Sequence, residues 1–171
     1  MIILGIDPGL RNTGWGVVHS QGNNLRHVAH GAIVSKTRDT LPKRLACLYD
    51  GLQQVIGEYQ PLEVAIERVF VNKNPNSTLL LGQARGAALL APAQHDIPVS
   101  EYSPNRIKKA LVGAGHAKKE QVAHMVRRLL VLPSDEGDCS DAFDALAVAI
   151  THAHFRQSQN RIRSREFADV R

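Results

Sequence analysis

The stretch Ile2-Ile3-Leu4-Gly5-Ile6-Asp7-Pro8-Gly9 decides the fold. Its continuous apolar run with β-branched residues predicts a strand buried on both faces, and Pro8-Gly9 predicts a sharp turn directly after that strand. Asp7 is thereby left at the mouth of the sheet. A single acid after a strand more often forms a turn, because Asp bonds its own backbone there, so a catalytic role requires further carboxylates at the same edge.

The residues after this turn predict an antiparallel meander. A second strand is predicted over residues 13–18 and a third within residues 25–34, with a polar break at residues 20–24. Because the connections are short, the first three strands are expected to pair antiparallel. Gly14 and Gly16 flank Trp15, and a bulge is the favoured interpretation, with close approach of another backbone or a ligand as the alternative.

The period of the apolar residues then changes. From residue 41 to residue 59 they recur at helical spacing, which predicts an amphipathic helix packed on the sheet. The apolar residues 64–66 predict a fourth strand that ends on Glu67, and a helix of this length permits a parallel crossover. If the strands that end on Asp7 and Glu67 are adjacent and parallel, both carboxylates lie at one end of the sheet, where open α/β sheets bind ligands.

The second half of the chain continues to alternate helices and strands. A helix is predicted from about residue 77 towards residue 90, ended or kinked by Pro92, followed by a strand over residues 99–102. Ser103-Pro104 predicts the start of a short helix that ends near Gly113, and Lys118-Lys119 the start of another. The predicted class is α/β, with a mixed five-stranded sheet (three antiparallel strands, then parallel βα units) flanked by helices.

Several basic and aromatic side chains could contact a nucleic acid. The predicted loop over residues 68–77 carries Phe70, which could stack on an unpaired base, and Lys73, which could contact a phosphate. Packing of Phe70 on the core is an equal alternative. Lys108 and Lys119 lie near helix starts, where they could clamp phosphates, although the local sequence favours a solvated charged face.

The last predicted helix begins with two acids and is otherwise apolar over Asp141-Ala142-Phe143-Asp144-Ala145-Leu146-Ala147-Val148-Ala149-Ile150. Residues at i and i+3 share a helix face, so Asp141 and Asp144 present two carboxylates side by side. As a structural alternative, the helix macrodipole favours acids at this end, each by roughly 0.3–1 kcal/mol. The second acid is nevertheless costly to bury without a compensating charge, which a divalent cation would supply.

The candidate catalytic and metal-binding acids are Asp7, Glu67, Asp141 and Asp144. Because no thiol cluster and no His-x-x-x-His ligand pair accompanies them, this oxygen donor set favours Mg²⁺ over zinc. We expect two Mg²⁺ ions per site, for which Mn²⁺ can substitute. Two such ions about 3.5–4 Å apart can activate a water and stabilise the leaving oxygen of a phosphodiester, which predicts hydrolysis without a covalent enzyme intermediate.

Composition indicates one domain and a polyanionic partner. The 171 residues carry 21 Lys and Arg against 16 Asp and Glu, a formal net charge of +5, which favours nucleic acid over an acidic membrane surface. Cys47 and Cys139 have no ligand spacing and are predicted to be buried thiols in a reducing compartment. With neither a signal peptide nor an apolar run of about 20 residues, we expect a cytoplasmic protein without a membrane partner.

Four motifs, in this order, resemble those of the bacterial RuvC Holliday-junction resolvases. They are Gly5-Ile6-Asp7-Pro8-Gly9, Ala65-Ile66-Glu67-Arg68-Val69-Phe70, Leu81-Gly82-Gln83-Ala84-Arg85-Gly86 and Asp141-Ala142-Phe143-Asp144-Ala145-Leu146-Ala147. The resemblance runs from residue 2 to about residue 154. An Asp-x-Gly turn after a strand is weak taken singly, but the joint occurrence of the four motifs is highly specific.

The resemblance implies a ribonuclease-H-like nuclease domain, which we assign to residues 1–156, followed by a basic C-terminal tail at residues 157–171 in which no motif aligns. It further implies a homodimer that nicks opposing strands of a four-way DNA junction with Mg²⁺, in recombination and repair. Its partner would be a branch-migration complex of RuvA and RuvB type subunits. By position, the four acids would be the metal-binding catalytic residues, Phe70 would stack at the junction centre, and Lys108 and Lys119 would be basic residues beside the active site.

Two other classes of function compete with this interpretation. A sugar-kinase or actin-like nucleotide-binding protein also begins with a strand and an Asp-x-Gly turn, but it predicts a second phosphate loop and a larger two-lobed chain; ATP binding would favour it. A structural DNA-binding module could use Phe70 equally well, but it gives no reason for four acids that repel phosphates in the absence of metal. Unchanged junction binding and processing after Asp7→Asn would favour that module.

Overall fold

A mixed five-stranded sheet forms the centre of the molecule. The computed structural model describes residues 1–69, 74–132 and 140–168, with side chains as far as residue 159. The strand order is β3-β2-β1-β4-β5, and the strands are β1 (Ile2–Asp7), β2 (Asn12–Gln21), β3 (Asn24–Val34), β4 (Glu63–Glu67) and β5 (Val99–Tyr102). Neighbours among β1, β2 and β3 pair antiparallel, whereas β4 pairs parallel with both β1 and β5. The predicted meander and parallel units are therefore confirmed.

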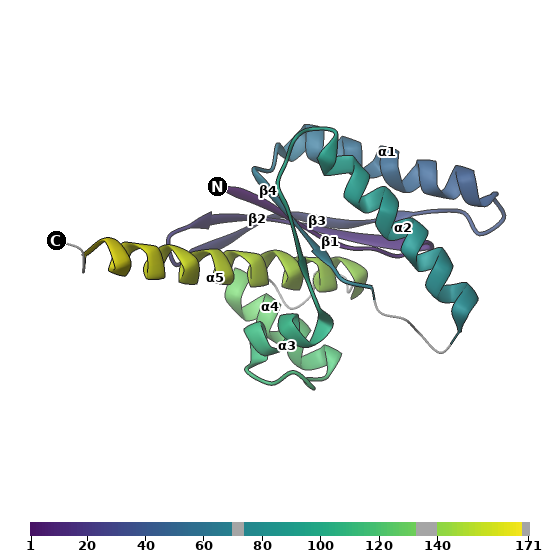
Figure 1. The fold of residues 1–171 in the computed structure, drawn as a ribbon. Coiled ribbons are helices and arrows are strands. Elements are labelled where there is room, and N and C mark those ends of the chain that lie inside the picture. The colour runs from purple at the N-terminus through teal and green to yellow at the C-terminus, as the bar shows by residue number, and fades with distance from the viewer. Residues whose placement is uncertain (70–73, 133–139, 169–171) are drawn as a thin grey trace.

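Helices cover both faces of this sheet (Figure 1). One face carries α1 (Leu41–Tyr59) and α2 (Pro75–Ala93), and the other carries α3 (Pro104–Val112), α4 (Lys119–Leu130) and α5 (Ser140–Ala168). Ile3 belongs to the core under α5, whereas Leu4 and Ile6 belong to the core under α1 and α2. All three are fully buried, each worth about 1.5–3 kcal/mol relative to exposure, so β1 is the two-sided buried strand that its sequence predicts.

The glycines of β1 and β2 let α5 pack unusually close to the sheet. A Cβ atom on Gly5 would lie 2.1 Å from the carbonyl oxygen of Ala145, and one on Gly16 would lie 2.7 Å from the Leu146 side chain. The favoured prediction of a bulge at Gly14 and Gly16 is wrong, because the register shift between β2 and β3 lies between Val17 and Val18. The alternative, close approach of another backbone, is what the structure contains.

Local signals account for the boundaries of α2 and α3. The Ser103 side chain accepts a hydrogen bond from the backbone N–H of Arg106, and α3 ends before Gly113, whose φ of 84° favours glycine. The Asn74 side chain accepts from two backbone N–H groups in the first turn of α2, which begins at Pro75 rather than near residue 77. Pro92 lies in the last turn of α2, consistent with the predicted end of that helix.

Three further predictions can be compared with the structure. The boundary at residue 157 does not coincide with the end of an element, because α5 continues through it to Ala168. Cys47 is exposed, so the prediction of a buried thiol is wrong for this residue, whereas Cys139 lies outside the described residues. Among the described helices, none is both long enough and apolar enough to cross a membrane.

Candidate active site

The ends of two parallel strands bring the first two candidate acids together. In the pairing of β1 with β4, Ile6 lies opposite Ile66, so the next residues along the two strands are Asp7 and Glu67. Both side chains are partly buried. The predicted adjacency of these carboxylates at one edge of the sheet is confirmed, because it follows directly from the parallel pairing of the two strands.

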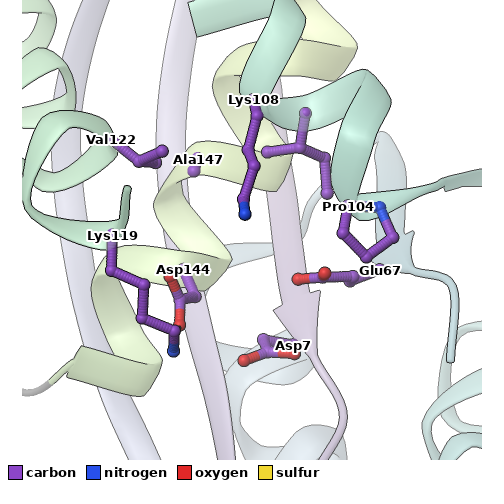
Figure 2. A pocket seen from close by; sticks show the side chains of 9 residues that line it. Asp7, Glu67, Pro104, Lys108, Lys119, Val122, Asp144 and Ala147 are labelled. Atoms are coloured by element: carbon purple, nitrogen blue, oxygen red, sulfur yellow. The ribbon is translucent and has the colours of Figure 1, made fainter. Parts of the chain in front are cut away.

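The first turns of α5 bring Asp144 to the same place. The carboxylates of Asp7, Glu67 and Asp144 face a shared space, with Lys108 reaching towards it from α3 (Figure 2). This space is a cavity of about 290 Å³, and its lining consists of Asp7, Glu67, Pro104, Ile107, Lys108, Lys119, Val122, Asp144 and Ala147. The fourth candidate, Asp141, is not among these lining residues, but its charge acts on Asp7.

Burial and mutual repulsion make the ionised forms of Asp7 and Glu67 unfavourable. Burial, reinforced by the charges of Glu67, Asp144 and Asp141, raises the pKa of Asp7 to about 8, against a smaller opposing effect of Lys119. Burial and the charge of Asp144 likewise raise the pKa of Glu67 to about 7. Fully ionised carboxylates at this position therefore require additional positive charge.

Two lysines supply part of that charge. The Lys119 ammonium donates a hydrogen bond to Asp144 over 2.8 Å, and this contact is the main reason that the pKa of Lys119 is raised. The Lys119 side chain is 72% exposed, so solvent screens the pair. The charges of Lys119 and Lys108 lower the pKa of Glu67. Both lysines line the cavity, although the local sequence favoured a solvated face for each.

The other two candidates, Phe70 and Lys73, fall outside the described residues. A buried histidine, His152, has its ring hydrogen-bonded to Glu63 over 2.6 Å and to the Tyr102 hydroxyl over 2.9 Å. Glu63 begins β4, whereas Glu67 ends it, so His152 lies at the opposite end of this strand from the carboxylate cavity.

The donor set fits a hard divalent cation. Three carboxylates converge, and two of them have raised pKa values. Among the described residues that line the cavity, the side-chain nitrogens are those of Lys108 and Lys119, which do not bind metal in their charged form. In the described parts of the chain, however, no three His, Cys, Asp or Glu side chains form a ready-made metal cluster. A bound ion would therefore have to compete with Lys119 for Asp144.

Sequence reasoning did not anticipate the apolar wall of this cavity. Ile107 of α3 and Val122 of α4 are 4% and 6% exposed, and they line the cavity together with Ala147 of α5. The spacing of apolar residues within each helix predicts that Ile107 and Val122 lie on buried faces. These faces form a cavity wall only because three helices pack around one edge of the sheet. Such a wall lowers the local dielectric and strengthens the charge interactions inside.

Comparison with known proteins identifies relatives along almost the whole chain. The family model described as crossover junction endodeoxyribonuclease RuvC matches residues 3–152. The crossover junction endodeoxyribonuclease RuvC of Brucella anthropi is 54% identical over 156 residues, which make up 91% of this chain and 90% of the relative. The protein of the same name from Bradyrhizobium sp. (strain ORS 278) is 54% identical over 157 residues, 92% of this chain and 89% of the relative.

Solved structures agree with the fold. The RuvC structure from Thermus thermophilus superposes with a TM-score of 0.84 at 33% identity and covers 93% of this chain and 97% of its own. A structure of T. thermophilus RuvC in complex with a Holliday junction substrate gives a TM-score of 0.86 at the same identity, with 93% and 96% coverage. These similarities confirm the ribonuclease-H-like fold class.

Proposed function

The chain belongs to the RuvC family of crossover junction endodeoxyribonucleases, and on this premise we propose that it resolves four-way DNA junctions by paired cuts on opposing strands, in recombination and repair. The observation that carries the proposal is the single cavity into which Asp7, Glu67 and Asp144 face, with Lys108 and Lys119 in its wall. The T. thermophilus RuvC that shares the fold was solved with a Holliday junction substrate, which supports the same substrate here.

The four acids Asp7, Glu67, Asp141 and Asp144 hold two Mg²⁺ ions in this proposal, and Mn²⁺ can take their place. Bound ions would activate the attacking water and stabilise the leaving oxygen of the scissile phosphodiester. The carboxylates must be ionised to bind a cation, and the raised pKa values of Asp7 and Glu67 show that burial and neighbouring charges disfavour the ionised form of these two acids. Ion binding and deprotonation of Asp7 and Glu67 are therefore coupled.

In the proposed enzyme the two lysines contact the DNA backbone, and the apolar wall strengthens these contacts. The Lys119 ammonium donates a hydrogen bond to Asp144 at the edge of the cavity, and from this position it would contact the scissile phosphate. Lys108 extends into the same cavity from α3 and offers a second positive charge for that phosphate (Figure 2). Ile107 and Val122 add buried apolar side chains to the lining of the cavity, which strengthens these charge interactions.

Two DNA-binding residues of the proposal lie outside the described residues. Phe70 stacks at the open centre of the junction, and Lys73 contacts a phosphate. Both follow the strand that ends on Glu67, so they lie close in sequence to a catalytic acid. The family resemblance alone supports a branch-migration complex of RuvA and RuvB type subunits as partner, and the proposal places the protein in the cytoplasm.

A homodimer completes the proposed enzyme, because two equivalent sites can serve two strands related by the approximate two-fold symmetry of the junction. One face of α2 is suited to such an interface. Leu79 and Leu90 are 67% and 51% exposed, and the positions between them on this face include Gly82 and Gly86, where an added Cβ atom would meet no atom within 4 Å. Two copies of this face could approach closely through the glycines and bury the leucines.

A cleavage assay tests the proposal directly. Purified protein is incubated with a labelled synthetic four-way junction or the matching linear duplex, with Mg²⁺ or with chelator, and the products are separated on a denaturing gel. Symmetric nicks on the junction alone, requiring Mg²⁺ and lost in Asp7→Asn but not in the exposed control Asp50→Asn, are expected. A junction that is bound but never cut with any divalent metal would overturn the proposal.

A further inference from the structure

Two side chains of α5 hold the carboxylate at the start of β4. The Nε2 atom of His152 is hydrogen-bonded to Oε2 of Glu63 over 2.6 Å, and the Nε atom of Arg156 lies 3.0 Å from Oε1 of the same carboxylate. The side chains of His152 and Glu63 are 8% and 21% exposed, so water competes little for their contact. Because hydrogen bonds prefer a narrow geometry, these contacts fix α5 to the start of β4 in a defined position.

The other nitrogen of the His152 ring connects α5 to β5. Its Nδ1 atom lies 2.9 Å from the hydroxyl oxygen of Tyr102. Because a carboxylate can only accept, Nε2 carries the hydrogen of the contact with Glu63, and Nδ1 can accept the hydroxyl hydrogen of Tyr102. The Tyr102 ring also stacks on Phe155 of α5, with ring centroids 5.5 Å apart. One buried histidine therefore connects α5 to two neighbouring strands.

The same helix and the same strand carry two of the catalytic acids, Asp144 and Glu67, which face one cavity (Figure 2). Glu63 lies four residues before Glu67 on β4, about 13 Å at the rise of a strand. His152 lies eight residues after Asp144 on α5, about 12 Å at the rise of a helix. The two elements run in opposite directions with matched spacing, so a shift of α5 along its axis would move both contacts together.

Packing of small residues resists such a shift only weakly. Where α5 comes closest to β1, a Cβ atom added to Gly5 would lie 2.1 Å from the carbonyl oxygen of Ala145 and 2.7 Å from the backbone nitrogen of Ala149. Small residues form shallow ridges and grooves, and apolar contact has no preferred direction. The directional hydrogen bonds of His152 are therefore suited to fix α5 along its axis.

We propose that His152 is a positioning residue for the catalytic site, because its hydrogen bonds to Glu63 and Tyr102 fix the axial position of α5 and with it the separation of Asp144 from Glu67. The inference rests on the proposed function, since it concerns how these acids bind Mg²⁺. His152 is not among the residues that line the catalytic cavity, so it acts through α5 and not on the DNA or the ions.

Three variants remove or keep these hydrogen bonds. Tyr102→Phe removes one hydroxyl and keeps the ring that stacks on Phe155. His152→Phe removes the contacts with both Glu63 and Tyr102 and keeps an aromatic ring of similar size. His152→Gln keeps one donor and one acceptor in a side chain of similar length, so it can restore both contacts.

Tyr49→Phe is the matched control. Tyr49 belongs to α1, on the other face of the sheet from α5, and its hydroxyl is hydrogen-bonded to Gln94 and, over 2.8 Å, to Gln53. The control therefore removes the same hydrogen-bonded atom from the same residue type without touching α5 or β4. A contribution to stability alone predicts the same behaviour for Tyr49→Phe and Tyr102→Phe, namely a lower melting temperature and unchanged metal binding.

The measurement is the melting temperature of each full-length variant, without DNA, as the Mg²⁺ concentration is raised. The rise in melting temperature with ion concentration gives the dissociation constant for Mg²⁺. We expect this constant to increase about threefold in Tyr102→Phe and about tenfold in His152→Phe, because small displacements of ligands have large effects at such sites. It should stay at the wild-type value in Tyr49→Phe and return towards that value in His152→Gln.

Single-turnover cleavage of the junction at the same Mg²⁺ concentrations should shift in parallel. Tyr102→Phe deletes a single oxygen atom, so it decides the question if His152→Phe does not fold. Equal Mg²⁺ dissociation constants for Tyr102→Phe and Tyr49→Phe would overturn the positioning role and leave only a contribution to stability. A wild-type protein that neither responds to Mg²⁺ nor cuts junctions would instead overturn the proposed function, so the two failures are distinguishable.

Discussion

The carbonyl oxygen of Asp141 lies 1.9 Å from the position that a Cβ atom on Gly14 would occupy. Gly14 on β2 is paired with Asp7 on β1. Gly14 therefore sets how closely α5, the helix that carries Asp141 and Asp144, can approach the strand that carries Asp7. The separation of Asp7 from Asp144 therefore depends on residue 14 being a glycine, which has no Cβ atom. A methyl group there would push the start of α5 away from the sheet.

Gly14→Ala is accordingly expected to damage both stability and activity. Overpacking of a protein interior typically costs about 1–3 kcal/mol, and each kcal/mol lowers the melting temperature of a domain of this size by about 2–4 °C. Junction cleavage should fall further than the loss of folded protein explains. Thermal unfolding and cleavage assays on the same preparation measure both effects.

Gly57→Ala provides the control for this substitution. Gly57 lies within α1, and an added Cβ atom there meets no atom within 4 Å, so the higher helix propensity of alanine should increase stability by up to about 1 kcal/mol. Cleavage should remain at the wild-type level. Full activity and an unchanged melting temperature in Gly14→Ala would show that α5 can shift without disturbing the acids.

The placement of Asp7 and Glu67 was predictable. Short apolar runs identify the two strands, and the helix between them in sequence permits parallel pairing, which puts the ends of both strands at one edge of the sheet. The role of Gly14 was not predictable, because the sequence favoured a bulge over close approach of another backbone as the explanation of glycines in this strand. What decides between the two is the backbone of α5, which is remote in sequence. The local sequence likewise did not place Lys108 and Lys119 at the cavity, although the family resemblance did, because the packing of α3 and α4 around the sheet edge brings them there.

The raised pKa values of Asp7 and Glu67 predict that the metal-free protein loses stability as the pH rises. Their pKa values in the folded protein, about 8 and about 7, exceed the ordinary values of 3.8 and 4.5. The unfolded chain therefore releases these protons at lower pH than the folded protein does, and their contribution to stability is complete below about pH 4 and is lost as the pH rises through 7 to 8.

Thermal unfolding between pH 5 and pH 9, with chelator or with Mg²⁺, measures this effect. We expect the melting temperature of the chelated protein to fall across the range, and Mg²⁺ to restore stability most strongly at high pH. Asp7→Asn should raise the melting temperature of the chelated protein at pH 9, whereas the exposed control Asp50→Asn should not. The same decline with pH in Asp7→Asn as in the wild type would exclude Asp7 as its source.

The ion pair between Lys119 and Asp144 leads to a kinetic prediction. If Lys119 contacts the scissile phosphate during cutting, Lys119→Ala should slow cleavage under single-turnover conditions by about 10²-fold, the usual scale for one electrostatic contact to a transition state, but weaken junction binding far less. Lys118→Ala removes the same charge from the adjacent exposed position and serves as control. Equal losses in binding and in cutting would contradict a role in the chemical step.

A substitution on the exposed face of α2 should abolish paired cutting of the junction without abolishing the cutting of single strands. Leu79→Glu places a charge on the face formed by Leu79, Gly82, Gly86 and Leu90. In the proposed homodimer this charge would lie in the interface, so the variant should be monomeric in analytical ultracentrifugation. None of the residues that line the catalytic cavity belongs to α2, so this cavity should stay intact. The junction should then receive single nicks rather than paired ones.

Leu62→Glu tests whether any exposed charge would have the same effect. Leu62 is 63% exposed and precedes β4, outside the α2 face, so this variant should remain dimeric and should make paired cuts. Because the two variants remove the same side chain at nearly equal exposure, only the position differs between them. A Leu79→Glu protein that remains dimeric and still cuts both strands would place the interface on another surface.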